Sequence, residues 1–302
     1  RDHIESYYAW RSASYLRLPV GGFTTVQNLQ PAIATPTTRP KLPIGSPALQ
    51  ELYQIGQNSA TWRLWQVEFT NRPDPTAQEQ FTDGLVRMGV GDYLDGIFML
   101  TSLDWQTDPE AQAFYQQLQT QPEFWQSLYP LPFQDLIQPW SSERELNPVL
   151  VTALIRQESR FMPGIVSVVG ATGLMQVLPE TADWIAPQID LEAFSLSNPE
   201  DNVELGTWYL DYTHSEWSGN SLLAVASYNA GPGNVADWLN RFSFEDPDGF
   251  VEQIPFPETR GYVESVFGNY WNYLRLYNPD IAEIVARYTV QTESLAQVGQ
   301  VE

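Results

Sequence analysis

The stretch NPVLVTALIRQESRF (Asn147–Phe161) predicts a helix with one carboxylate on its apolar side. Asn147 followed by Pro148 is typical of a helix start, because asparagine caps the first turn and proline fits the first helical position. A helix from Pro148 places four side chains on one stripe, and these are Val151, Leu154, Ile155 and Glu158. The glutamate therefore occupies the apolar face, while Arg156 points elsewhere.

A carboxylate in apolar surroundings has chemical consequences. Removal from water disfavours its charged form and raises its pKa. A carboxyl group that keeps its proton near neutral pH can act as a general acid. The alternative is that Glu158 lies in a frayed last turn, where its side chain reaches water, and the helix pattern alone leaves both open.

Outward from this helix, the rest of the chain also has helical patterns. No convincing alternating run favours a large sheet, so the sequence predicts a mainly α fold. We expect one aromatic-rich helix over residues 1–18 and a short helix after Asn278. Further helices are expected to start or run at Ser46, Pro179, Asn198-Pro199, Ser221 and Pro257–Tyr277.

Composition shifts predict the domain organisation. Residues 1–45 form an N-terminal helix and a Pro/Thr-rich connector, and residues 46–140 form a helical domain. Within it, Leu52-Tyr53-Ile55-Gly56 is matched 33 residues later by Leu85-Val86-Met88-Gly89, a period typical of stacked helix pairs. Irregular helical packing is the alternative to such a solenoid. Three prolines in residues 127–140 interrupt the helices, and a second domain at 141–285 precedes a tail at 286–302.

Composition also excludes several function classes. The 302 residues include 15 Lys+Arg and 37 Asp+Glu, a net charge of −22, which argues against nucleic-acid binding. There is no cysteine, and the two histidines are His3 and His214, so neither thiolate catalysis nor a histidine-rich metal site is expected. No apolar run is long enough for a membrane span. The opening RDHIESYYAW shows no targeting signal.

Three later segments place glycines beside amide or aromatic side chains. They are GATGLMQVLPETA (residues 170–182), ASYNAGPGNV (226–235) and IPFPETRGYV (254–263). Glycine lets a ligand approach the backbone, and Gln176, Tyr228 and Asn229 offer hydrogen bonds and stacking area that suit sugars. Each glycine taken singly is explained as well by a turn or a helix end.

Taken together, four blocks in order carry a resemblance: ALIRQESRF, GATGLMQVLP, SYNAGPGNV and IPFPETRGYV. Residues from about 129 to 278 resemble the soluble lytic transglycosylases of bacterial cell walls, whose catalytic domain is related to goose-type lysozyme. The interval from Glu158 to Gly173 is also usual in that family. The resemblance implies a lysozyme-like helical domain at 141–285. The region before it is similar to the superhelical arm of longer family members in its helical pattern, without a shared motif.

The resemblance also implies roles for named residues. Glu158 is the single catalytic acid, followed by the family's usual serine at Ser159. Substrate contacts fall to Ser159, Gln176, Leu178, Tyr228 and Asn229, with support from Glu258 and Tyr262. Leu178 departs from the family, which commonly has methionine there to line the sugar groove, and this puts subsite preference in doubt.

The family's reaction cleaves the β-1,4 bond between N-acetylmuramic acid and N-acetylglucosamine and leaves a 1,6-anhydro ring, with no metal or organic cofactor. It implies peptidoglycan strands as partner and the periplasm or cell envelope as location, although a charge of −22 is unusual for an enzyme of an anionic polymer. The N-terminal helical domain offers surface for protein contacts.

Two alternatives stay open. A goose-type hydrolase would use Glu180 or Asp183 as base, because most glycosidases need two carboxylates. A catalytically silent wall-binding protein would keep the site without turnover.

Overall fold

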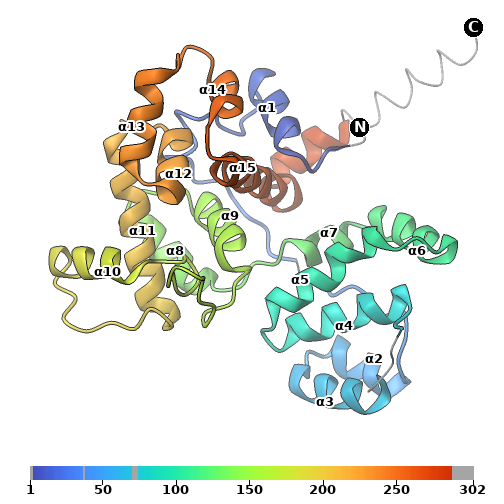
Figure 1. Cartoon of the computed structure of the whole chain (residues 1–302). Coiled ribbons are helices and arrows are strands. Elements are labelled where there is room, and N and C mark those ends of the chain that lie inside the picture. Colours follow the sequence, from blue (N-terminus) through green and yellow to red (C-terminus); the bar gives the residue numbers. More distant parts are fainter. Residues whose placement is uncertain (1–2, 37, 70–73, 288–302) are drawn as a thin grey trace, which may run out of the picture. The chain divides into compact units, whose positions relative to one another are not determined.

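The computed structural model describes residues 3–36, 38–69 and 74–287. Contacts divide the chain into two compact units (Figure 1). Unit 1 comprises Arg1–Ala34, Phe133–Ser159 and Pro163–Glu302, and unit 2 comprises Thr35–Pro132 with Arg160–Met162. The domain limits expected at residues 45, 140 and 285 stay predictions, and residues 288–302 of the expected tail lie outside the described residues.

Unit 2 is built from helices in consecutive pairs. They are α2 (Pro47–Gln54), α3 (Asn58–Phe69), α4 (Ala77–Gly89), α5 (Tyr93–Thr101), the 3-10 turn η1 (Ser102–Trp105), α6 (Pro109–Gln119) and α7 (Pro122–Leu128). Ser46 caps α2 as expected, and the pairs α2–α3 and α4–α5 coincide with the two copies of the 33-residue pattern. The shared core includes Tyr53, Leu85 and Val86 of this pattern, whereas Ile55 is 63% exposed, so only some of its apolar positions are packing positions.

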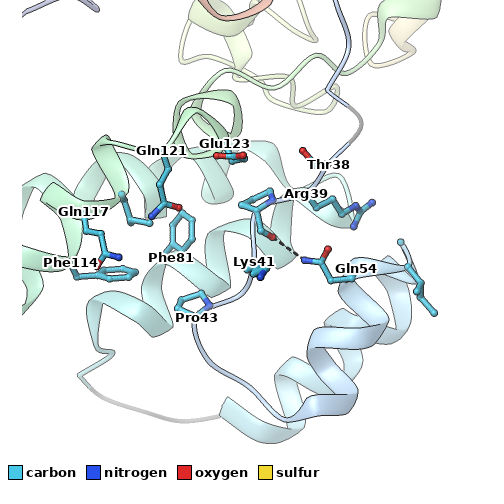
Figure 2. A pocket seen from close by; sticks show the side chains of 14 residues that line it. Thr38, Arg39, Lys41, Pro43, Gln54, Phe81, Phe114, Gln117, Gln121 and Glu123 are labelled. Atoms are coloured by element: carbon cyan, nitrogen blue, oxygen red, sulfur yellow. Dashed lines mark hydrogen bonds between the residues drawn. The ribbon is translucent and has the colours of Figure 1, made fainter.

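A groove of about 910 Å³ lies between the connector and the helices of unit 2 (Figure 2). Its lining combines Phe81 and Phe114 with amide side chains and with Lys41, the only lysine of the chain. The connector is fixed beside the groove by a hydrogen bond of 3.3 Å from Gln54 Nε2 to the Pro40 carbonyl.

Unit 1 contains the remaining helices. They are α1 (Tyr7–Tyr15), α8 (Gln134–Glu143), α9 (Pro148–Ser159), α10 (Pro179–Ile185), the turn η2 (Ala186–Gln188), α11 (Pro199–Glu216), α12 (Ser221–Ala230), α13 (Pro232–Arg241), α14 (Pro247–Gln253) and α15 (Pro257–Tyr277). In the described ranges, β pairing is limited to isolated bridges from Thr172 to Val166 and Val177. The mainly α prediction is confirmed, as are the helices expected at Pro148, Pro179, Pro199, Ser221 and Pro257–Tyr277. Residues 279–287 are also helical.

The structure corrects the sequence analysis at several places. The first helix spans only Tyr7–Tyr15, and the break expected over residues 127–140 is confined to 129–133. α8 continues through Pro139, although an interior proline removes one hydrogen bond and crowds the carbonyl four residues before it. The helices α13 and α14 were not predicted, although each begins with a proline that follows a turn residue.

The N-terminal segment is an integral part of unit 1. The Trp10 ring stacks on Phe267 with centroids 4.7 Å apart, and Arg11 Nε lies 2.6 Å from Asp248 Oδ1. At the end of the segment, the Ala34 amide donates to the Tyr277 carbonyl at 2.8 Å. Residues 3–34 therefore pack along α15 from Phe267 to Tyr277 and stabilise the helix that faces α9. No helix in the described part combines the length and apolarity needed to cross a membrane.

Candidate active site

Glu158 lies in the last turn of α9, where the buried helix reaches the surface of unit 1. The Asn147 side chain starts this helix by accepting from the Val149 amide at 3.0 Å, and the α9 residues before Arg156 are all buried. Glu158 itself is half-buried. Burial raises the pKa of its carboxyl group to about 7, helped by the charge of Glu258 and opposed by a hydrogen bond from Tyr262. The carboxyl group therefore holds its proton over the range in which a general acid works.

α15 supplies the hydrogen-bond partner of this carboxyl group. Asn269 holds α15 against α9, because it accepts from Arg156 Nη1 at 2.9 Å and donates to the Ala153 carbonyl. Two turns earlier, the buried Tyr262 hydroxyl donates to Glu158 Oε1 at 2.5 Å. Burial and the nearby Glu158 charge raise the pKa of Tyr262 well above its ordinary value, so it stays a donor.

A second tyrosine approaches from α12. The Tyr228 hydroxyl donates to the Met175 carbonyl at 2.9 Å, and its pKa is raised well above normal by burial and by the charges of Glu158 and Tyr209. The interaction with Glu158 and the bond to Met175 place Tyr228 between the acid and the loop that carries Gln176. The structure thus brings together Glu158, Tyr228 and Tyr262, three residues that are far apart in the sequence.

The loop at Gln176 has a strained and well-anchored backbone. Gln176 adopts a φ of 50°, and its side-chain Nε2 donates to the Gly173 carbonyl at 2.9 Å and the Ile165 carbonyl at 3.2 Å. Gly173 has a φ of 87°, and a Cβ there would lie 2.3 Å from the Leu196 carbonyl oxygen. Glycine is therefore required at this position for packing as well as for its backbone angle.

Two residues that sequence reasoning missed position the loop and the α12 end. The buried Asn202 of α11 accepts from the Met175 amide at 2.7 Å and donates to the Thr172 carbonyl at 2.8 Å. Thr259 of α15 donates to Asn229 Oδ1 at 2.6 Å, which fixes the orientation of that amide. The only sequence signal for either was a polar residue at a helix position that faces inward.

The other expected site residues differ in exposure. Leu178 is half-buried at the start of α10, and Glu258 is exposed in the first turn of α15. Ser159 is 2 % exposed and donates to the Ile155 carbonyl of its own helix at 3.2 Å. This placement favours a structural role for Ser159, at odds with the expected substrate contact. Glu180 and Asp183, the bases of the hydrolase alternative, are exposed on α10.

His214 and Ser221 form a separate polar pair that does not build a catalytic triad. Nε2 of His214 lies 3.0 Å from Ser221 Oγ and its Nδ1 lies 2.8 Å from the Leu210 carbonyl, with both residues fully buried. Burial lowers the pKa of His214 to about 4. Within the described ranges, no three His, Asp or Glu side chains gather closely enough to hold a metal ion.

Comparisons with known proteins identify this region. Residues 135–250 match the family described as "Transglycosylase SLT domain". The soluble lytic murein transglycosylase of Escherichia coli K12 is 40% identical over 157 residues, and a putative soluble lytic murein transglycosylase of Haemophilus influenzae is 37% identical over 146. These matches cover 50% and 47% of this chain, but only 24% and 25% of the relatives.

Solved structures share the fold over most of the chain. The 70 kDa soluble lytic transglycosylase Slt70 of E. coli superposes with a TM-score of 0.62 at 24% identity, covering 91% of this chain and 43% of Slt70. An inactive glutamate-to-glutamine mutant of lytic transglycosylase Slt from Pseudomonas aeruginosa gives a TM-score of 0.61. The expected fold, a helical N-terminal region and a lysozyme-like helical domain, is thereby confirmed. Over residues 135–250, the chain is therefore similar to the transglycosylase SLT domain family.

Proposed function

We propose that the protein is a peptidoglycan lytic transglycosylase in which Glu158 acts first as acid and then as base. The observation that carries the proposal is the pKa of about 7 at Glu158, with Tyr262 bonded to the same carboxyl group. Names of the relatives support it, since they are lytic murein transglycosylases. The chain spans about a quarter of the length of these curated relatives.

In the first step, protonated Glu158 gives its proton to the oxygen that links N-acetylmuramic acid to N-acetylglucosamine. The bond from C1 of the muramyl sugar to that oxygen breaks, and the acetamido oxygen of the same sugar stabilises the positive charge at C1. A lone acid suits such substrate-assisted chemistry, which is an exception to the two-carboxylate rule. Glu258, the other acid whose charge raises the pKa of Glu158, is exposed and suits positioning.

In the second step, ionised Glu158 takes the proton from the muramyl 6-hydroxyl as its oxygen bonds to C1. The 1,6-anhydro ring closes and Glu158 is protonated again, so the proton balance is complete. An internal hydroxyl avoids the entropy of capturing water, an advantage that reaches about 7–11 kcal/mol in good geometry. Gln176, Tyr228 and Asn229 would orient the sugars, and Leu178 would line the neighbouring subsite.

The test combines one substitution with the mass of the product. We expect Glu158→Gln to lower the turnover of purified peptidoglycan by at least about 10²–10⁴-fold, since general acid–base catalysis contributes that much. The matched control, Glu180→Gln on exposed α10, should keep native turnover. Near-normal turnover of the Glu158 variant would remove the proposal.

Product mass distinguishes the proposed reaction from its alternatives. Internal capture gives muropeptides lighter by one water than hydrolysis gives. Reducing-end products together with inactive Glu180→Gln would support the goose-type hydrolase, and binding without any product would support the silent wall-binding protein. We place the protein at the bacterial cell envelope, where its substrate lies.

A further inference from the structure

A row of aromatic side chains leads away from the candidate active site in unit 1. It starts at Tyr228 and continues through four rings, Tyr209, Tyr212 and Trp208 of α11 and Trp184 of α10. Ring centroids lie 5.3 Å apart from Tyr228 to Tyr209 and 6.0 Å apart from Tyr209 to Tyr212. Trp184 then lies 5.1 Å from Tyr212 and 5.2 Å from Trp208. We call these four rings the aromatic row.

Helical geometry explains why the row is continuous. Trp208 and Tyr212 are four residues apart on α11, so their rings stack nearly parallel at 5.9 Å, with an interplanar angle of 8°. α10 packs against α11 and adds Trp184 edge-on to both rings. The core side of α11 is formed by other residues, among them Val203, Leu205, Leu210 and His214.

The aromatic row is exposed to solvent at Trp184, the end opposite to Tyr228. Trp184 is 45% exposed, and the three α11 rings are half-buried. If Trp184 served only to pack α10 against α11, full burial of its ring would stabilise that contact most. An exposed indole supported from behind by stacked rings is instead typical of binding surfaces, where tyrosine and tryptophan supply contact area at small entropic cost.

We propose that the aromatic row is an additional saccharide-binding surface that holds the glycan strand beyond the sugars next to Glu158. This inference rests on the proposed function for the identity of the polymer. The C–H groups on one side of a pyranose ring form an apolar face that packs on an indole, while the hydroxyl groups stay in water. Continuity from Tyr228 to Trp184 gives a long polymer a path on from the site of chemistry.

The charge of the protein strengthens the argument. A chain of net charge −22 repels an anionic wall polymer, and salt screens that repulsion without turning it into attraction. Stacking on uncharged rings needs no opposite charge. The aromatic row therefore supplies attraction to the glycan strand that the net charge of this chain does not supply.

The experiment compares long and short substrates in Trp184→Ala and in the conservative Trp184→Phe. On long glycan strands, we expect Trp184→Ala to lower kcat/KM about 5- to 10-fold, as loss of an aromatic contact of about 1 kcal/mol or more implies. On a tetrasaccharide muropeptide, kcat/KM should stay within about 2-fold of native. Trp184→Phe should restore most of the rate on long strands, because it keeps a stacking ring.

The matched control is Trp105→Ala, which removes a 67% exposed indole from η1 of unit 2. It should leave both rates unchanged. Equal losses on long and short substrates, no loss with Trp184→Ala, or the same loss in the control would each overturn the proposal. A thermal melt of Trp184→Ala checks its folding, and Trp184→Phe gives the answer if the alanine variant is unfolded.

Binding separates this inference from the proposed function. In the Glu158→Gln background, adding Trp184→Ala should weaken the binding of purified glycan strands about 5- to 10-fold, whatever reaction the native protein catalyses. If the double variant bound glycan strands as tightly as Glu158→Gln does, the proposal for the aromatic row would be wrong and the proposed function would be unaffected. Weaker binding combined with hydrolytic products would leave the row in place and remove the transglycosylase mechanism. Capture of a protein in place of glycan by this face would also count against the proposal.

Discussion

Glu158 and His214 are two ionisable groups of unit 1 whose surroundings shift their pKa values in opposite directions. Burial raises the pKa of Glu158 to about 7 and lowers that of His214 to about 4, and in each case it favours the neutral form. His214 is enclosed, with both ring nitrogens bonded to Leu210 and Ser221. Glu158 is half-buried at a helix end, and one of its oxygens accepts from Tyr262.

The difference teaches that a shifted pKa identifies a catalytic group only when a substrate can reach it. Desolvation acts on both side chains, but at His214 the protein itself supplies the hydrogen-bond partners, and the pair serves packing between α11 and α12. At Glu158, the site lies where three helices and a strained loop converge. Perturbed pKa values occur in structural networks as well as in active sites, and access separates the two.

The two groups also give stability an opposite dependence on pH. The neutral form of Glu158 is favoured by folding, so its contribution to stability is fully present below pH 4.5 and is lost as pH rises through about 7. His214 binds its proton less readily when folded, so its contribution is present above pH 6.5 and is lost as pH falls towards about 4. Each effect has an upper bound of about 3 kcal/mol.

The largest expected effect on stability comes from the enclosed group. His214→Ala leaves the Ser221 hydroxyl buried without its partner and opens a cavity, so we expect the free energy of unfolding to fall by about 3 kcal/mol at pH 7.5. Urea unfolding measures this loss, and the catalytic rate of the folded fraction should stay native.

The control for this change is His3→Ala, because the His3 side chain is 83% exposed and should contribute less than about 0.5 kcal/mol. An unchanged stability of His214→Ala, or a folded variant that has lost its catalytic rate, would contradict the assignment of His214 to packing.

An effect of at most the same size is expected at Glu158, the proposed catalytic acid. Glu158→Gln removes a carboxylate that is charged and desolvated at pH 8, so the variant should gain up to about 3 kcal/mol over the native protein between pH 4.5 and pH 8. Unfolding in urea at both pH values measures the gain. Glu180→Gln, at an exposed position, should show no such gain. If the gain in stability of Glu158→Gln were the same at both pH values, Glu158 would not be desolvated.

The smallest effect sharpens the role of Tyr262. The hydrogen bond from Tyr262 lowers the pKa of Glu158, so Tyr262→Phe should raise that pKa and move the alkaline limb of the kcat/KM profile to higher pH. The maximum rate should fall about 10-fold, because the carboxyl group loses its orienting partner. Tyr8→Phe, at an exposed tyrosine of α1, should leave the profile unchanged. A limb that moves to lower pH would contradict this role of Tyr262.

The helices were largely predictable because their signals are local. The cap and proline at Asn147-Pro148 and the apolar run to Tyr277 gave α9 and α15 their correct starts or ends. The signals for α13 and α14 are equally local, because Pro232 and Pro247 each follow a turn residue, so these two helices were predictable as well. The fit of residues 3–34 to α15 could not be predicted, because it depends on pairings such as Trp10 with Phe267 across most of the chain.

For the site, the sequence by itself determined which chemistry was available: a carboxylate in an apolar stripe, with amides and tyrosines in glycine-bearing segments, and neither thiol nor histidine cluster. Tertiary structure alone decided that Tyr262 bonds to Glu158, that Asn202 and Thr259 hold the neighbouring groups, and that Ser159 faces inward. The physical reason is that residue type and helical period fix the face on which a side chain lies, whereas desolvation and hydrogen-bond partners depend on elements that meet only in the folded chain.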